Sequence, residues 1–244
     1  MSKIKIEDIK AQLALDNWKV ISTEYKNLDT EMTFQCDEGH TVYSTWRKIR
    51  SRRECPICLQ NKYKTNGFTV IPKKKDTKRV LGLDQATRIS GWSIYDNDEL
   101  VQYGTFETGL DDEAARIHSI KEWLINMTNL WEPDLVGIEG LQYQANMGVT
   151  VFEKLARLQG VLIEALYELN IPFQICPTNT WRHYCGVKGK TRSDKKRSMQ
   201  LKAKEWFDVS LSDDEADAIG IGKYVSENFK IPLGEAQVNI EIWE

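Results

Sequence analysis

Residues 80–95, VLGLDQATRISGWSIY, decide the fold of the larger part of the chain. They contain two short apolar runs, 80–84 and 91–95, and each has the length and composition of a buried strand. A third run, 101–108, follows an Asp-Asn-Asp turn at 96–98. Three strands in succession are therefore predicted.

Strands and helices alternate after these three strands. Helical periodicity is present at 112–131, 150–170, 193–207 and 212–227, and further strands are predicted at 135–139 and 171–176. This order predicts an α/β domain with a mixed five-stranded sheet flanked by helices.

The residues before this domain are organised differently. Residues 1–60 read as a small module with a helix near 6–15 and a strand near 31–35. The stretch after it contains Asn-Gly, a proline and a run of lysines, which are typical of a linker. We expect a module over 1–62, a basic linker over 63–78 and the α/β domain over 79–244.

The composition is that of an ordinary globular protein. Of 244 residues, 41% are hydrophobic and 28% are charged, which excludes wholesale disorder. No apolar run approaches the roughly 18 residues that a membrane-spanning helix needs. The first ten residues carry acids and have no apolar core, so no secretory signal is predicted. Five cysteines are an odd count that argues against a disulfide framework, and we expect a cytoplasmic protein.

The charge is distributed unevenly along the chain. Residues 1–79 carry a net charge of +7 and residues 80–244 one of −10. Within the acidic part, residues 182–204 contain nine lysines and arginines and one acid, Asp194. A solvated helix face is the ordinary explanation of one such run, but two basic regions in one chain favour a nucleic-acid partner.

Four metal-ligating residues form the pattern C-x3-H-x14-C-x2-C: Cys36, His40, Cys55 and Cys58. Two such pairs joined by a short loop are typical of a closed tetrahedral Zn²⁺ site, and a module with few large apolar residues needs one to be stable. All four positions are filled by protein, so the zinc is predicted to be structural. The alternative is four unrelated buried or redox-active residues. Basic residues lie between the two pairs and suit phosphate contact: Arg47, Lys48, Arg50, Arg52 and Arg53.

Carboxylates end two of the predicted apolar strands, Asp84 the first and Glu139 the fourth. An acid in this position is partly desolvated, which is costly unless a cation or a donor compensates. A single acid at the end of a strand more often has a hydrogen-bond donor nearby and needs no cation. Two of them favour a cation site.

An acidic cluster at 213–217 completes the set. Asp213 and Glu215 need no explanation beyond helix capping, since Ser212 and Glu215 form a capping box. Asp214 and Asp217 are three residues apart and project from one face of the helix. Together with the two strand-end acids they are predicted to hold two Mg²⁺ (or Mn²⁺) ions for phosphodiester attack.

These motifs resemble a known family. LGLD at 81–84 with GWSI at 91–94, GIE at 137–139 and DEADAI at 214–219 resemble the ordered acidic motifs of the RuvC-type Holliday junction resolvases, over about residues 79–226. The segment around the cysteines resembles the zinc-ribbon or treble-clef modules attached to phage and viral nucleases.

The resemblance implies a ribonuclease H-like fold and a structure-selective endodeoxyribonuclease that resolves Holliday junctions and other branched DNA with two metal ions. It implies that Asp84, Glu139, Asp214 and Asp217 are the catalytic metal ligands. The segment 152–161 resembles the family's dimer helix, where Ala156 and Gly160 form a strip of small residues, and a homodimer is expected. The residues expected to contact DNA are Lys188, Lys190, Arg192, Lys195, Arg182, Arg50, Arg52 and Tyr143, with Lys188 or Lys190 near the scissile phosphate.

The chain departs from the family pattern in one motif. Gln85 and Ala86 replace the family's usual Pro-Gly after the first acid, and this, with the added zinc module, indicates a phage version acting in a bacterial or phage-infected cytoplasm. Two rival functions were weighed. A kinase of the actin and hexokinase class is disfavoured because there is no glycine-rich phosphate loop after Asp84. A catalytically idle zinc-containing DNA-binding protein on the same scaffold is the remaining alternative.

Overall fold

The computed structural model describes residues 4–51, 55–58, 70–143 and 148–229. The chain divides into two compact units. The first is Met1–Val70, with which Ile125–Leu130 is grouped, and the second is Ile71–Leu124 with Trp131–Glu244. Each unit is described by itself.

The first unit is a small sheet with two helices. Its elements in chain order are α1 (Ile6–Ala14), β1 (Lys19–Val20), β2 (Glu31–Gln35), β3 (Thr41–Thr45) and α2 (Trp46–Ser51). The strands pair antiparallel in the order β1-β2-β3. The helix and strand expected near 6–15 and 31–35 are confirmed. β1, β3 and α2 were not predicted; β1 has two residues and α2 six, too few to show a period, whereas β3 is as long as β2.

The second unit holds the five-stranded sheet. Its elements are β4 (Arg79–Asp84), β5 (Ile89–Asp96), β6 (Glu99–Glu107), α4 (Glu113–Trp131), β7 (Leu135–Gly140), α5 (Val149–Glu168), β8 (Phe173–Pro177), α6 (Thr178–Tyr184), α7 (Arg192–Phe207) and α8 (Asp213–Asn228). The strand order is β6-β5-β4-β7-β8. β4, β5 and β6 pair antiparallel, and β4, β7 and β8 pair parallel, so the mixed sheet predicted from the sequence is confirmed.

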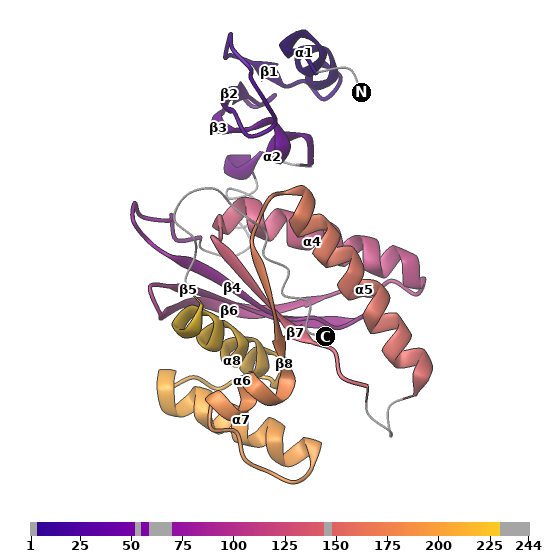
Figure 1. Ribbon diagram of the computed structural model, residues 1–244, viewed down its shortest axis with the longest axis vertical. Coiled ribbons are helices and arrows are strands. Elements are labelled where there is room, and N and C mark those ends of the chain that lie inside the picture. The colour runs from indigo at the N-terminus through magenta and orange to yellow at the C-terminus, as the bar shows by residue number, and fades with distance from the viewer. Residues whose placement is uncertain (1–3, 52–54, 59–69, 144–147, 230–244) are drawn as a thin grey trace. The chain divides into compact units, whose positions relative to one another are not determined.

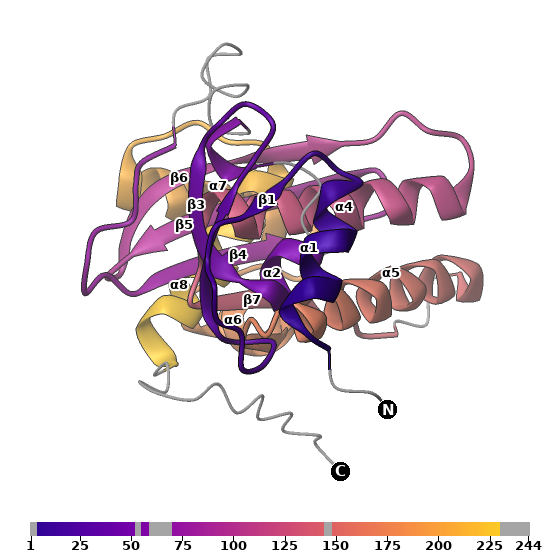
Figure 2. The same ribbon diagram turned by 90° about the horizontal axis from the view of Figure 1, so that it is seen from above.

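Helices cover both faces of this sheet. α4 and α5 run side by side on one face, as both views show (Figures 1 and 2), and ion pairs join them between Arg157 and Glu113 and between Lys121 and Glu164. α8 lies on the other face, with α6 and α7 beyond it (Figure 1). The sheet, α6, α7 and α8 share one apolar cluster, in which Val80, Trp181, Met199 and Ile219 are fully buried.

Two glycines in the strands allow α8 to lie very close to the sheet. A Cβ atom on Gly82 of β4 would stand 2.5 Å from the backbone nitrogen of Gly222, and one on Gly91 of β5 would collide with the carbonyl oxygen of Asp214. The Ser93 hydroxyl donates to the carbonyl oxygen of Ala218 at 2.7 Å across the same contact. The sheet therefore fixes where the acidic end of α8 lies.

The basic stretch before β4 is not a free linker throughout. Residues from Ile71 onward belong to the second unit. Lys73 is paired with Asp134, and Lys78 donates to the carbonyl oxygen of Ser226. Part of the positive charge counted in the N-terminal region thus holds this segment in place, while residues 63–69 of the predicted linker lie outside the described residues.

Candidate active site and metal cluster

A cavity of about 570 Å³ opens at the edge of the sheet where β4 and β7 end. It is lined both by acids and by basic residues at the start of α7. Its charged lining residues are Asp84, Glu139, Arg182, Lys190, Arg192, Lys195, Lys196, Asp214 and Asp217. All four acids predicted from the sequence therefore meet at one cavity.

The strands and α8 explain how distant acids come together. β4 and β7 are parallel neighbours with Leu83 opposite Ile138, so Asp84 and Glu139 leave the sheet at the same edge. Asp214 and Asp217 stand in the first two turns of α8, which the glycine contacts hold against β4 and β5. The Ser212–Glu215 capping box predicted at this helix start is present.

The metal-free acids oppose one another electrostatically. Burial raises the pKa of Asp84 well above its usual range, and the nearby charges of Glu139, Asp217 and Asp214 raise it further. Burial also raises the pKa of Asp217 to about 6, against the opposing effect of the Arg182 guanidinium. Asp217 is 3% exposed, and its Oδ1 atom has no hydrogen-bond partner within the described residues. Such a site favours the binding of cations.

Two basic side chains enter this acidic group. Arg182 Nη2 lies 2.8 Å from Asp217 Oδ2 and 3.9 Å from Glu139 Oε1. Lys196 Nζ lies 3.0 Å from Asp213 Oδ2 and 4.0 Å from Asp214 Oδ1. Arg182 was expected to contact DNA, but its side chain, 18% exposed, pairs with an acid of the site.

The other residues expected to contact DNA fall into separate places. Lys190, Arg192 and Lys195 line the cavity, and Lys188 does not. Tyr143 is 56% exposed, with its ring edge-on to Phe152 at a centroid distance of 5.7 Å.

The basic residues of the first unit are also divided. Arg50 is exposed on α2, and Arg52 lies outside the described residues. Arg47 forms two hydrogen bonds with Asp29, at 2.8 and 3.0 Å, so its guanidinium already has a carboxylate partner.

Three residues that contact Glu139 were not identified from the sequence. Trp181 Nε1 donates to Glu139 Oε1 at 3.2 Å, and Arg182 lies over the Trp181 ring at 4.9 Å. The side-chain amides of Gln85 and Gln159 both donate to the main-chain oxygen of Glu139 at 2.8 Å. The replacement of the family's Pro-Gly at Gln85 was the only signal that pointed to any of them.

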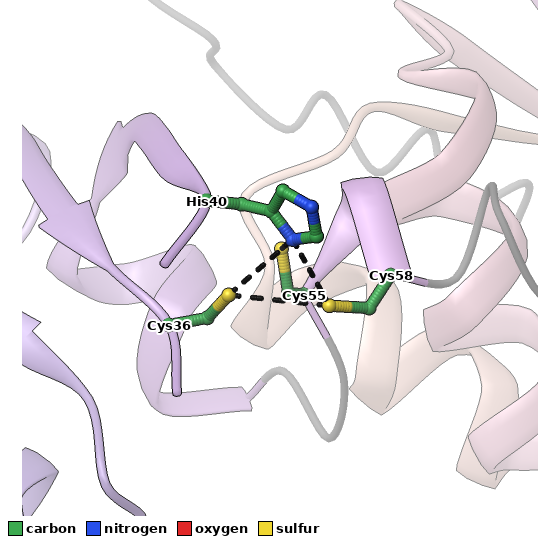
Figure 3. Close-up of side chains that lie close together, drawn as sticks. All are labelled: Cys36, His40, Cys55 and Cys58. Carbon is green, nitrogen blue, oxygen red and sulfur yellow. Dashed lines mark hydrogen bonds between the residues drawn. The ribbon is translucent and has the colours of Figure 1, made fainter. Parts of the chain in front are cut away.

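The Cys/His set in the first unit is a compact cluster (Figure 3). The ligand atoms of Cys36, His40, Cys55 and Cys58 all lie within 4.8 Å of one another. His40 Nδ1 is 3.6 Å from Cys36 Sγ, 4.0 Å from Cys55 Sγ and 3.2 Å from Cys58 Sγ. Ligands of a tetrahedral zinc ion stand roughly 3.5–3.8 Å apart, given bonds of about 2.0–2.3 Å. These four residues can therefore hold a metal ion.

Local backbone structure brings each ligand pair together. Cys36 follows β2, and its turn to His40 is closed by hydrogen bonds from the Gly39 amide to the Cys36 carbonyl and from the Cys36 amide to the His40 carbonyl. Gly39 has φ of +81°, which favours glycine. Cys55 precedes a helical turn at 56–58 that contains Cys58. Burial raises the pKa of Cys58 to about 12 in the absence of a cation, so metal binding would release a proton there.

The sequence suggested that a metal makes up for a scarcity of large apolar residues in this module. The structure shows instead that the module has an apolar core. Ile9, Phe34, Trp46 and Ile49 are all at most 3% exposed and pack with Cys36 and Cys55 in one hydrophobic group. The metal ligands are thus part of a core.

A mixed sheet in the order found here, with acids at the ends of its two central parallel strands and on the helix across them, defines the class of the second unit: it has a ribonuclease H-like nuclease fold. The family model described as "Crossover junction endodeoxyribonuclease RuvC" matches residues 80–222. The chain belongs to this family, and this membership supports a junction-resolving endodeoxyribonuclease.

Two similar proteins illustrate the relation. A crossover junction endodeoxyribonuclease RuvC from Fusobacterium nucleatum subsp. nucleatum is 27% identical over 156 residues, which cover 59% of this chain and 77% of that protein. The structure of T. thermophilus RuvC in complex with a Holliday junction substrate has a TM-score of 0.50 at 14% identity, covering 62% of this chain and 96% of that chain. This structural likeness confirms the fold. In the part of the chain that the structure describes, no helix has the length and apolarity to span a membrane.

Proposed function

We propose that this protein is a structure-selective endodeoxyribonuclease that resolves Holliday junctions and other branched DNA, with Asp84, Glu139, Asp214 and Asp217 as ligands of two Mg²⁺ (or Mn²⁺) ions. The observation that carries the proposal is the mutual repulsion of the acids in the cavity. Four acids share it, and burial, followed by the nearby negative charges of the other three acids, raises the pKa of Asp84. The family membership of residues 80–222 supports the substrate class.

The acids fit such ions in their chemistry. Carboxylate oxygens are the hard donors that Mg²⁺ and Mn²⁺ prefer, and the unpartnered Oδ1 of Asp217 is available as a ligand. When bound, the two ions would lower the pKa of the attacking water and stabilise the leaving 3′ oxygen.

Other residues at or beside the cavity are proposed to bind the phosphate backbone and to orient the acids. Lys190, Arg192 and Lys195 give it a cationic wall, which is proposed to hold a phosphate backbone. Trp181 orients the Glu139 carboxylate through its indole N–H. Arg182 neutralises Asp217 before a cation binds there. Tyr143 is exposed beside Phe152 and is proposed to stack against an unpaired base.

We further propose that the active form is a homodimer joined through α5. Ala156 and Gly160 are exposed, and a Cβ atom on Gly160 would meet nothing within 4 Å among the described residues. The strip of small residues is therefore not used for packing within the described chain, and Val149, seven residues before Ala156 and so on the same helix face, is 58% exposed. A two-fold enzyme suits paired nicks in a four-way junction. A monomeric mass at micromolar concentration, both free and on DNA, would refute the dimer.

For the first unit we propose a structural Zn²⁺ on Cys36, His40, Cys55 and Cys58, and DNA contact through Arg50 and Arg52. The ligand spacing supports zinc because it matches a tetrahedral ion and leaves no position for water. We propose two domains, over 1–62 and 79–244, joined by residues 63–78. We also propose that the protein acts in the cytoplasm of a bacterium or of a phage-infected host.

The decisive experiment compares a four-way junction with a linear duplex of the same sequence, in Mg²⁺ and in EDTA. We expect cleavage of the junction only when Mg²⁺ is present, with the duplex intact. Binding of the junction without cleavage in Mg²⁺ or Mn²⁺ would favour the alternative, a catalytically idle zinc-containing DNA-binding protein.

A further inference from the structure

Gln85 follows the first acid of the site and occupies an unusual position. It is 5% exposed and lines the cavity together with Asp84 and Glu139. Its Nε2 atom donates to the main-chain oxygen of Glu139 at 2.8 Å, which fixes the orientation of the amide. The other end of the amide, Oε1, is buried and has no hydrogen-bond partner within the described residues.

A buried acceptor without a partner is costly, and in native structures it usually has an explanation. The Glu139 carbonyl does not need Gln85 as its only donor, because Gln159 Nε2 also donates to it at 2.8 Å. Anchoring of Glu139 therefore explains the amide nitrogen of Gln85 but not its oxygen. An amide oxygen is a neutral, hard acceptor, suited to Mg²⁺ or to a water molecule bound to it.

We propose that Gln85 is a positioning residue of the metal site, whose Oε1 atom accepts a hydrogen bond from water on the cation held by Asp84 and Glu139. The inference rests on the proposed function, since it presupposes that these acids bind a divalent cation. It assigns a role to the position at which this chain has Gln85-Ala86. The side chain extends from the end of β4 to the main chain of β7, so Gln85 connects the two strands that carry Asp84 and Glu139.

The test is the affinity of the full-length, metal-stripped protein for Mn²⁺, measured by calorimetry and by the loss of the free-ion EPR signal. Gln85→Met keeps the shape but removes the oxygen, and we expect its Mn²⁺ affinity to fall about tenfold, as for other residues around metal ligands. Gln159→Met is the matched control, because it removes the same kind of bond to Glu139 but no unpartnered buried oxygen. We expect it to change the affinity no more than about twofold.

Gln85→Glu provides the second arm. It retains an oxygen at the same place, so it should bind Mn²⁺ at least tenfold more tightly than Gln85→Met. Thermal unfolding of the metal-free variants checks that each is folded. Equal Mn²⁺ affinity of wild type and Gln85→Met, or an equal loss in Gln85→Met and Gln159→Met, would overturn the inference. Wild type that binds no Mn²⁺ at all would instead overturn the proposed metal site, so the two failures are distinguishable.

Discussion

The two candidate metal sites of this chain differ in how much of the site exists before a cation binds. In the first unit, four ligand atoms lie within 4.8 Å of one another, inside an apolar core. In the second unit the carboxylates line an open cavity, and Arg182 and Lys196 pair with acids there. The difference is that between a closed site, which supports a fold, and an open one, which leaves room for a substrate.

The ligand chemistry follows the same division. Thiols are neutral when buried, and burial raises the pKa of both Cys55 and Cys58. They can be held together without a cation. Carboxylates that are brought together repel, and Asp84 and Asp217 respond with raised pKa values. The first site can thus assemble without a cation, whereas the second is costly to assemble until a cation binds.

The largest effect is expected at the closed site. Cys58→Ser leaves three ligands, so the first unit should lose most of the folding free energy that metal binding provides. Structural zinc provides roughly 10 kcal/mol in small modules. Metal analysis should show one zinc per wild-type chain and none in Cys58→Ser. Cys176→Ser is the control, since that thiol is buried in the second unit and should leave the zinc in place. Wild-type protein without stoichiometric zinc would refute the closed site.

The next effect concerns the open site. Asp217→Asn keeps the side-chain shape but removes a charge that the cations need, so single-turnover cleavage of a four-way junction should fall at least about 1000-fold, or roughly 4 kcal/mol. Junction binding should be retained or tighter, because repulsion of phosphate is reduced. Asp213→Asn on the same helix is the control, since Asp213 does not line the cavity. Cleavage by Asp217→Asn at the wild-type rate would reduce the acidic cluster to a helix cap.

A smaller effect is expected on the stability of the metal-free protein. The folded-state pKa of Asp84 is raised, so ionising it costs stability, and that cost grows as the pH rises above about 4. Asp84→Asn should therefore be more stable to urea than wild type by about 1–3 kcal/mol at pH 7 in EDTA, with no such gain at pH 4. Mg²⁺ should reverse the order. Glu99→Gln, at an exposed acid of β6, is the control and should show neither change. Equal stability of Asp84→Asn and wild type at pH 7 would contradict the proposed cost of ionising Asp84.

The smallest effect distinguishes two neighbouring lysines. Lys190 lines the cavity and Lys188 does not. Lys190→Ala should weaken junction binding about fivefold and reduce the slope of log affinity against log salt by about one, because one phosphate contact is lost. Lys188→Ala should change the slope less. Equal slopes for both variants would mean that the phosphate backbone does not pass along this wall of the cavity.

The sequence by itself determined the order of the elements and the chemistry of the ligands. Apolar periodicity is a local property, so β4, β5 and α8 were predicted nearly to the residue. The Cys/His cluster proposed to bind zinc was identifiable from spacing, because each pair lies in one turn. The four acids were identifiable because each ends an apolar strand or stands on one face of a helix.

Only the tertiary structure decided the partners of these residues. Arg182 looks like part of a basic run in the sequence, but 35 positions separate it from Asp217, its carboxylate partner. Gln85 and Glu139 are 54 positions apart, and their contact depends on the parallel pairing of β4 with β7. The approach of α8 depends on glycines at 82 and 91, whose importance shows only when the helix lies against them. Charge, hydrogen bonding and close packing act between neighbours in space, and a local pattern identifies the side chains without stating which of them will meet.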